Sequence, residues 1–382
     1  MKTNYLQSEY KMRSMIIVLT FLCIPFLSTG QDFTFDHNGE TREYKLYKPA
    51  NVPDNAPLVF VLHGYGGNNQ GMVKFGMNVL ADGNEFVVCY PQGLPDDKGT
   101  THWNAKLRLS SVDDIDFLSE LAKFLHTEHN LNPQGTFSTG FSNGGFMSYT
   151  LASVAPEIFK AVAPISGLMS GDTWDEFNST TPVPILHIHG STDNVVPIDG
   201  SMSTDGGWGG APAVDSLISF WAQFNNCTEK DTTDFPPRTT AYYNRKGVNS
   251  HEVWYYLVDG MAHAWPTSIT NDGIIASEVV WEFFSHYLSN TPIVNDETNS
   301  IQRNNIIIYP NHASTHLVIV NKNSNLLNYK LFSINGKQIL SGNTRQNVLR
   351  LDIAKMSRGM HLLYLEGKTL SKTFKFQNIT SN

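Results

Sequence analysis

The sequence is poor in cysteine and in positive charge, and it has no long hydrophobic run. Its 382 residues include three cysteines, and 27 Lys and Arg residues are set against 35 Asp and Glu residues, for a formal net charge of −8. Lys and Arg form no cluster, so electrostatics give no reason to expect nucleic-acid binding. The N-terminal apolar run, 15–27, is too short for a comfortable membrane span. The hydrophobic content of 41% is typical of a globular protein.

The first residues are typical of a targeting segment. A positively charged start precedes the apolar run, and small residues follow it before Gln31. This order predicts a secretory signal peptide over 1–30, and the alternative is a buried N-terminal helix. Removal of that segment leaves Cys89 and Cys227. Secretion permits a disulfide between them, but two cysteines do not decide it.

Between residues 44 and 288 the sequence alternates between apolar runs and segments with helical periodicity. The expected strands are 56–64, 85–93, 135–142, 159–167, 182–190 and 251–260. The expected helices are 71–84, 113–130, 143–156, 212–226 and 276–288. Continuous apolar strands separated by amphipathic helices predict the α/β class, with a mostly parallel sheet and helices on both faces. We expect this domain to cover 31–289.

The C-terminal part differs from this alternation in its sequence pattern. Residues 290–304 are polar and predict a linker, and short strand-like runs fill 305–382. Asn335 and Gly336 stand between alternating apolar residues, which is a hairpin signal. The tail is therefore predicted to be a small all-β sandwich module.

The segment Gly140-Phe141-Ser142-Asn143-Gly144 joins an expected strand to an expected helix. It fits the pattern G-x-S-x-G, in which a sharp turn holds a serine with its hydroxyl exposed above the sheet. Side chains two residues away would clash, so both flanking positions are glycine. Ser142 is our candidate nucleophile.

A serine hydroxyl needs a base, and the base needs an orienting carboxylate. In this type of site the chain order is serine, acid, histidine, with each residue after a strand. Asp193 follows the strand 182–190 and His263 follows the strand 251–260. These positions predict a triad of Ser142, Asp193 and His263 at one rim of the sheet.

The oxygen that becomes negative during acyl transfer requires N–H donors. Asn143, after the serine, and Tyr65, in the glycine-rich loop after the first strand, are the predicted oxyanion-hole residues. The alternative for the loop is a plain turn. Trp103 and Trp208 lie in loops, where they would bind substrate or only pack the structure.

The segments "PLVFVLHGYGGN", "GFSNGGFMSY", "HGSTDNVVP" and "GMAHAWP" resemble the secreted esterase family of feruloyl esterases and polyhydroxybutyrate depolymerases over about 40–290. The resemblance implies an α/β-hydrolase fold, a serine esterase reaction and no cofactor. By position it matches Ser142 to the nucleophile, Asp193 to the acid and His263 to the base. His102 stands where many members have cysteine, which puts their usual disulfides in doubt. We expect no metal site.

The tail, with "IIIYPNHASTHLVIV" and "MHLLYLEG", is similar to the C-terminal sorting module of the type IX secretion system. That similarity implies export across an outer membrane, release or attachment at the cell surface, and the secretion machinery as a partner. The leading hypothesis is a secreted carboxylesterase acting on feruloyl or related acyl esters of plant cell-wall polysaccharide. The alternatives are an extracellular polyester depolymerase and a non-catalytic surface-binding protein on the same fold.

Overall fold

The computed structural model describes residues 30–50 and 52–288 and, with short gaps, residues 306–378. Apart from Gly30, the predicted signal peptide lies outside the described residues, and so does the predicted linker, 290–304. Within them no helix is both long and apolar enough to cross a membrane.

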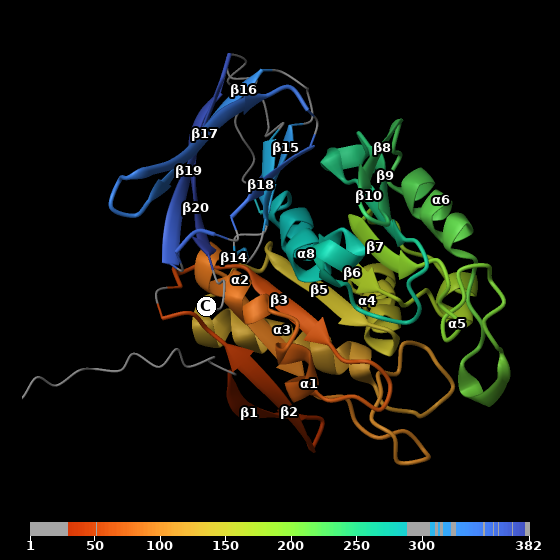
Figure 1. Cartoon of the computed structure of the whole chain (residues 1–382). Helices are drawn as coiled ribbons and strands as arrows, with labels where there is room; N and C mark the ends of the chain where they lie inside the picture. Colours follow the sequence, from red (N-terminus) through yellow and green to blue (C-terminus); the bar gives the residue numbers. More distant parts are fainter. Residues whose placement is uncertain are drawn as a thin grey trace, which may run out of the picture.

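A ten-stranded sheet organises the larger part of the chain, in the order β1-β2-β4-β3-β5-β6-β7-β10-β9-β8 (Figure 1). Its central strands, from β4 to β10 in that order, are parallel. Antiparallel strands complete both edges. The strands are β1 (Gln31–His37), β2 (Glu40–Tyr47), β3 (Leu58–Leu62), β4 (Val87–Pro91), β5 (Thr136–Phe141), β6 (Ala161–Ile165), β7 (Ile185–Gly190), β8 (Glu229–Phe235), β9 (Thr239–Arg245) and β10 (Val253–Val258).

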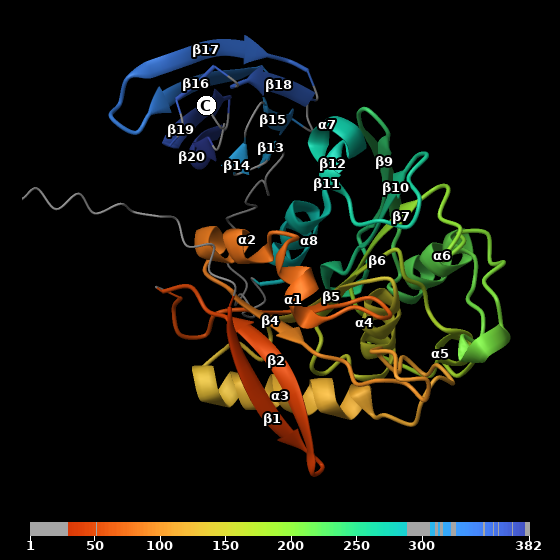
Figure 2. The same ribbon diagram turned by 60° about the horizontal axis from the view of Figure 1, so that its bottom comes forward.

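Helices cover both faces of this sheet. Because side chains alternate along a strand, Leu58, Phe60 and Leu62 of β3 join one core, and Val59 and Val61 join the other. Helices α3, α4 and α6 pack on the first core, and α1, α2 and α8 pack on the second; Figure 2 shows α3 and α8 on opposite sides of the sheet. The helices are α1 (Asn69–Val73), α2 (Met77–Asn84), α3 (Asp114–His129), α4 (Asn143–Val154), α5 (Gly171–Asp175), α6 (Val214–Phe224), α7 (Ile269–Asp272) and α8 (Ala276–Ser285).

The single helix expected over 71–84 is two helices, α1 and α2. Gly76 lies between them with φ +87°, a left-handed conformation that a continuing helix cannot contain. The expected helix over 113–130 agrees with α3. Its start is capped by the Asp113 carboxylate, which accepts from the Asp116 N–H, and it ends at Asn130 with φ +51°.

The C-terminal module consists of a three-stranded and a five-stranded sheet, and its nearly all-antiparallel pairing agrees with the predicted all-β tail. Leu317 and Leu351 from the first sheet share one core with Leu331 and Leu363 from the second. The predicted Asn335-Gly336 hairpin is confirmed, since β16 and β17 pair on either side of that turn. The strands are β13 (Ile306–Tyr309), β14 (His312–Ala313), β15 (His316–Asn321), β16 (Leu327–Ser333), β17 (Gln338–Thr344), β18 (Val348–Asp352), β19 (Gly359–Gly367) and β20 (Leu370–Asn378).

The two cysteines for which a disulfide was considered, Cys89 and Cys227, are free thiols in the structure. Cys89 is fully buried in β4, and Cys227 follows α6 at a half-buried position. Both are unpaired, so the structure contains no bridge between them.

Candidate active site

Ser142 occupies the sharp turn between β5 and α4 that the sequence predicts. Its backbone has φ +54° and ψ −118°, a conformation that costs energy for a residue with a side chain. Hydrogen bonds hold it there: the Ser142 N–H donates to the Ile165 carbonyl (2.9 Å), and the Ser142 carbonyl accepts from Gly145 (2.7 Å) and Phe146 (3.0 Å). The turn is therefore fixed by both the neighbouring strand and its own helix.

The two flanking glycines are required by close backbone approach. A Cβ atom at Gly140 would lie 2.4 Å from the Gly144 carbonyl oxygen, and one at Gly144 would lie 2.4 Å from the Leu62 carbonyl oxygen. Both distances are far below any real carbon–oxygen contact. The second contact also shows that the loop after β3 packs directly against the turn that carries Ser142.

Asp193 and His263 are joined by a hydrogen bond although 70 residues separate them. The His263 Nδ1 atom lies 2.7 Å from Asp193 Oδ2. The loops after β7 and β10 hold them together, because the Ser191 N–H donates to the Val258 carbonyl and the Thr192 N–H donates to the Met261 carbonyl. The pair thus sits where two adjacent parallel strands end.

The imidazole of His263 lies beside the serine turn. Its ring centroid is 4.8 Å from that of Phe141, the residue directly before Ser142. The next residue, Ala264, accepts a hydrogen bond from the Ser166 hydroxyl at the end of β6 (3.1 Å). The structure therefore brings the three predicted triad residues to the same end of the sheet.

The surroundings of Asp193 favour its ionised form. Burial by itself would raise its pKa, but hydrogen bonds from His189, His263 and the Val196 N–H outweigh that effect and hold the pKa well below its usual range. Its Oδ1 atom accepts from the N–H groups of Val195 and Val196, both at 2.9 Å. Such a group orients the imidazole and stabilises its protonated form.

The predicted oxyanion-hole residues belong to two segments that meet beside Ser142. Asn143 is the first residue of α4, so helix geometry leaves its N–H without an acceptor inside the helix. Tyr65 follows Gly64, where a Cβ atom would lie 3.4 Å from the Ser142 Cβ atom. The Asn143 side chain and the Trp103 backbone exchange two hydrogen bonds (2.6 and 2.9 Å), which ties a third loop to this region.

The two predicted substrate-binding tryptophans lie in different surroundings. Trp103 is fully buried, and its indole N–H donates to the His63 carbonyl (3.0 Å), so the packing alternative describes it and direct substrate contact does not. Trp208 is half-buried and packs edge-to-face on Tyr65, with ring centroids 5.3 Å apart. The Tyr65 hydroxyl donates to Asp96 (2.6 Å), which fixes this exposed ring in place.

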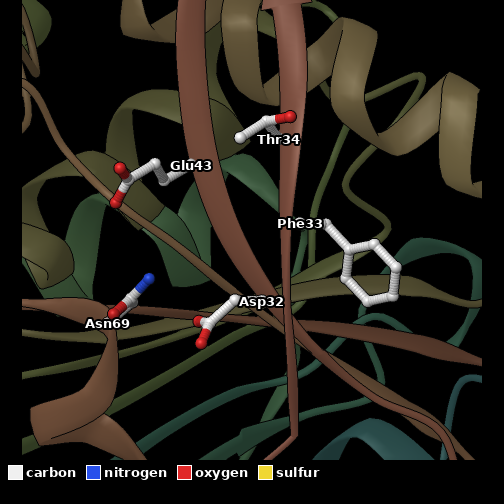
Figure 3. Close-up of a pocket in the computed structure, with 5 residues that line it drawn as sticks. All are labelled: Asp32, Phe33, Thr34, Glu43 and Asn69. Atoms are coloured by element: carbon white, nitrogen blue, oxygen red, sulfur yellow. The ribbon is translucent and has the colours of Figure 1, made fainter.

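A separate cavity of about 610 Å³ lies at the edge of the sheet. It is lined by Asp32, Phe33, Thr34, Glu43 and Asn69, and Figure 3 shows the Phe33 ring on the other side of β1 from Asp32 and Thr34. None of the predicted site residues is among this lining. Two of its lining residues, Asp32 and Glu43, carry carboxylates, and Asp32 is ion-paired with Lys45.

Sequence reasoning missed two histidines next to the acid. His187 and His189 point from β7 into the buried interior, and His189 Nε2 lies 3.2 Å from Asp193 Oδ2. The pattern His-x-His immediately before Gly190 was the available signal, since residues two apart on a strand share one face.

Comparisons with known proteins agree with this arrangement. Residues 42–221 match the family model described as esterase PHB depolymerase, and residues 307–378 match the secretion system C-terminal sorting domain. This range is therefore similar to the esterase PHB depolymerase domain. Ser142 and Asp193 fall inside the matched range of that domain, and His263 follows it.

Curated relatives include NocK from Nocardia uniformis subsp. tsuyamanensis, which is 32% identical over 42% of this chain. The bifunctional acetylxylan esterase/xylanase XynS20E of Neocallimastix patriciarum is 25% identical over 67% of this chain. The chain spans 48% of NocK and 35% of XynS20E. Feruloyl esterase C of Emericella nidulans (strain FGSC A4 / ATCC 38163 / CBS 112.46 / NRRL 194 / M139) is 28% identical, over 64% of this chain and 83% of the relative.

A solved structure, the acetyl xylan esterase from Aspergillus awamori, aligns with a TM-score of 0.50 and 18% identity, over 67% of this chain and 99% of that one. At this identity the likeness concerns the fold alone. With the sheet order and the serine turn described above, it confirms the predicted α/β-hydrolase fold.

Proposed function

We propose that this protein is an exported serine carboxylesterase whose reaction uses Ser142, His263 and Asp193. The observation that carries the proposal is the 2.7 Å bond from His263 Nδ1 to a buried, ionised Asp193, at the same end of the sheet as the strained serine turn. A bonded Nδ1 leaves Nε2 as the ring nitrogen available to the serine.

The proposed reaction has two halves. The Ser142 oxygen attacks the ester carbonyl carbon while His263 takes its proton, and the N–H groups of Asn143 and Tyr65 stabilise the negative oxygen. His263 then gives the proton to the departing alcohol. Water attacks the acyl group in the second half, His263 again moves the proton, and the carboxylic acid leaves.

For substrate we propose feruloyl or acetyl esters of plant cell-wall polysaccharide. The relatives named for feruloyl and acetylxylan esterase activity support this choice. A polyester depolymerase is the second candidate, and it is favoured by the family model that matches residues 42–221. Purified protein assayed on methyl ferulate, acetylated xylan and polyhydroxybutyrate would separate the two candidates.

The sorting domain at residues 307–378 supports export to the cell surface or the medium through type IX secretion. We propose that the N-terminal segment 1–30 is a signal peptide that takes the chain across the inner membrane first. The catalytic part would then meet its polymeric substrate outside the cell.

The decisive test is the substitution Ser142→Ala. We expect turnover to fall by roughly 10⁶-fold, because the nucleophile is lost while Ala keeps the backbone turn. A fluorophosphonate probe should label the parent protein at Ser142 and leave the variant unlabelled. An unlabelled parent, or a variant with a rate within tenfold of the parent, would favour a non-catalytic binding protein on this fold.

A further inference from the structure

A chain of buried polar side chains runs from the helix that follows Ser142 to the carboxylate of Asp193. The Tyr149 hydroxyl of α4 lies 3.0 Å from His187 Nδ1, and His187 Nε2 lies 3.0 Å from His189 Nδ1. His189 Nε2 donates to the Val196 carbonyl (2.9 Å) and lies 3.2 Å from Asp193 Oδ2. Tyr149, His187 and His189 are all fully buried.

The acceptors at the end of this chain fix the direction of its hydrogen bonds. The Val196 carbonyl and the ionised Asp193 can only accept, so His189 Nε2 carries a proton. In a neutral His189 the Nδ1 atom then accepts from His187 Nε2, and His187 Nδ1 accepts from the Tyr149 hydroxyl. Burial, together with the nearby His189, holds the pKa of His187 well below its usual range, in keeping with a neutral ring.

The chain acts on the segment that shapes the carboxylate. Val196 donates its N–H to Asp193 Oδ1 while its carbonyl accepts from His189, so His189 holds both the acid and the backbone that orients it. The other carboxylate oxygen of Asp193, Oδ2, lies 3.2 Å from His189 Nε2 and also accepts from His263. A small rotation of this carboxylate would change the direction in which His263 points toward Ser142.

We propose that His189, set in one proton arrangement by His187 and Tyr149, is a positioning residue that holds Asp193 for His263. This inference rests on the proposed function, because it concerns the same triad. This buried series of side chains couples the helix that follows Ser142 to Asp193 through β7.

The test compares His189→Leu with His189→Gln. Leu removes the donor, and we expect kcat to fall roughly tenfold to a hundredfold, by analogy with the loss of groups that orient metal ligands, with KM within twofold. Gln places an amide N–H near the position of Nε2, so it should recover most of kcat. His187→Phe, which leaves His189 Nδ1 without its donor, should give a smaller loss.

Rates are expressed per active site titrated with a fluorophosphonate, so that a variant that folds poorly is not mistaken for a slow enzyme. His126→Leu is the matched control. His126 is a half-buried histidine that forms a hydrogen bond with Thr136 (2.6 Å) and takes no part in the series from Tyr149 to Asp193. We expect its kcat per site to equal that of the parent.

A His189→Leu rate per site within threefold of the parent would overturn the inference, and so would a Gln variant no faster than Leu. Both outcomes leave the proposed function standing if the parent hydrolyses esters and Ser142→Ala does not. If the parent protein shows no ester hydrolysis that is lost in Ser142→Ala, both proposals are overturned.

Discussion

Buried residues around the site depend on hydrogen bonds that satisfy their polar atoms. His63, on the loop before Tyr65, shows this most clearly. Its Nε2 atom accepts from the Gly93 N–H (3.0 Å), and its Nδ1 donates to the Gly64 carbonyl (2.8 Å). This pattern uses a neutral imidazole with one proton. The loop that supplies a predicted oxyanion donor therefore depends on an uncharged histidine.

Acid should destabilise the fold through this residue. Burial lowers the pKa of His63 to about 4, against about 6.5 in an unfolded chain. Between these values only the unfolded state binds the proton, so the free energy of unfolding falls as the pH falls. From pH 7 to pH 5 we expect His63 to contribute a loss of about 2 kcal/mol. Urea unfolding at both pH values should show a smaller loss for His63→Gln than for the parent.

The other buried histidines with lowered pKa values, such as His187, add to the loss in both proteins and cancel in the comparison. Asp193 does not interfere, because its pKa is depressed and its contribution is lost only below the ordinary carboxyl value of about 4. Equal pH dependence in parent and variant would contradict this role for His63.

At the level of elements, the sequence predicts the centre of the sheet well and its edges poorly. Strands β3, β4 and β6 are continuous apolar runs, and β5, β7 and β10 are almost wholly buried, because both faces of these strands are covered. The edge strands β1 and β8 have mostly exposed side chains, so they lack that signal and were not predicted. The Asn38-Gly39 turn between β1 and β2, with both residues at positive φ, was a readable hairpin signal.

The sequence offers signals for the proposed triad positions, because chain order and strand ends constrain them. Contacts between distant elements could not be predicted, since nothing local marks them. Arg42 of β2 and Asp114 of α3 form an ion pair at 2.6 Å, and both side chains are at most 1% exposed. Asp114 also accepts from the Asn104 N–H, next to Trp103. The pair joins an edge strand, a helix and the loop that contacts Asn143.

Arg42→Met should destabilise the protein by about 3–5 kcal/mol, because it leaves a buried carboxylate without its counter-charge. Chemical denaturation of parent and variant would measure the change. Arg108→Met is the matched control: Arg108 pairs with Asp172 at 2.9 Å, but its side chain is 74% exposed. Exposed pairs contribute about 0–1 kcal/mol. Equal losses of unfolding free energy in the two variants would mean that the buried pair contributes no more to stability than the exposed pair.

The whole molecule consists of two modules with separate cores. The sheet of the α/β module, residues 31–288, has its own core on each face, and the C-terminal module packs around Leu331, Leu363 and their neighbours. One hydrogen bond between described residues of the two modules joins Arg350 Nη2 to the Pro236 carbonyl (2.5 Å). Division into independent cores fits a division of labour between chemistry and export.

Removal of the tail should therefore leave the chemistry intact. A chain that ends at Thr291 keeps α8, the last helix, and every residue placed in the proposed reaction. We expect its kcat/KM on a soluble ester to stay within twofold of the full chain, because the tail core shares no residue with the two cores of the sheet. In a host with type IX secretion, the same truncation should remain inside the cell envelope. An inactive but folded truncation would show that the tail completes the active site, and normal export without it would assign the sorting signal to the α/β module.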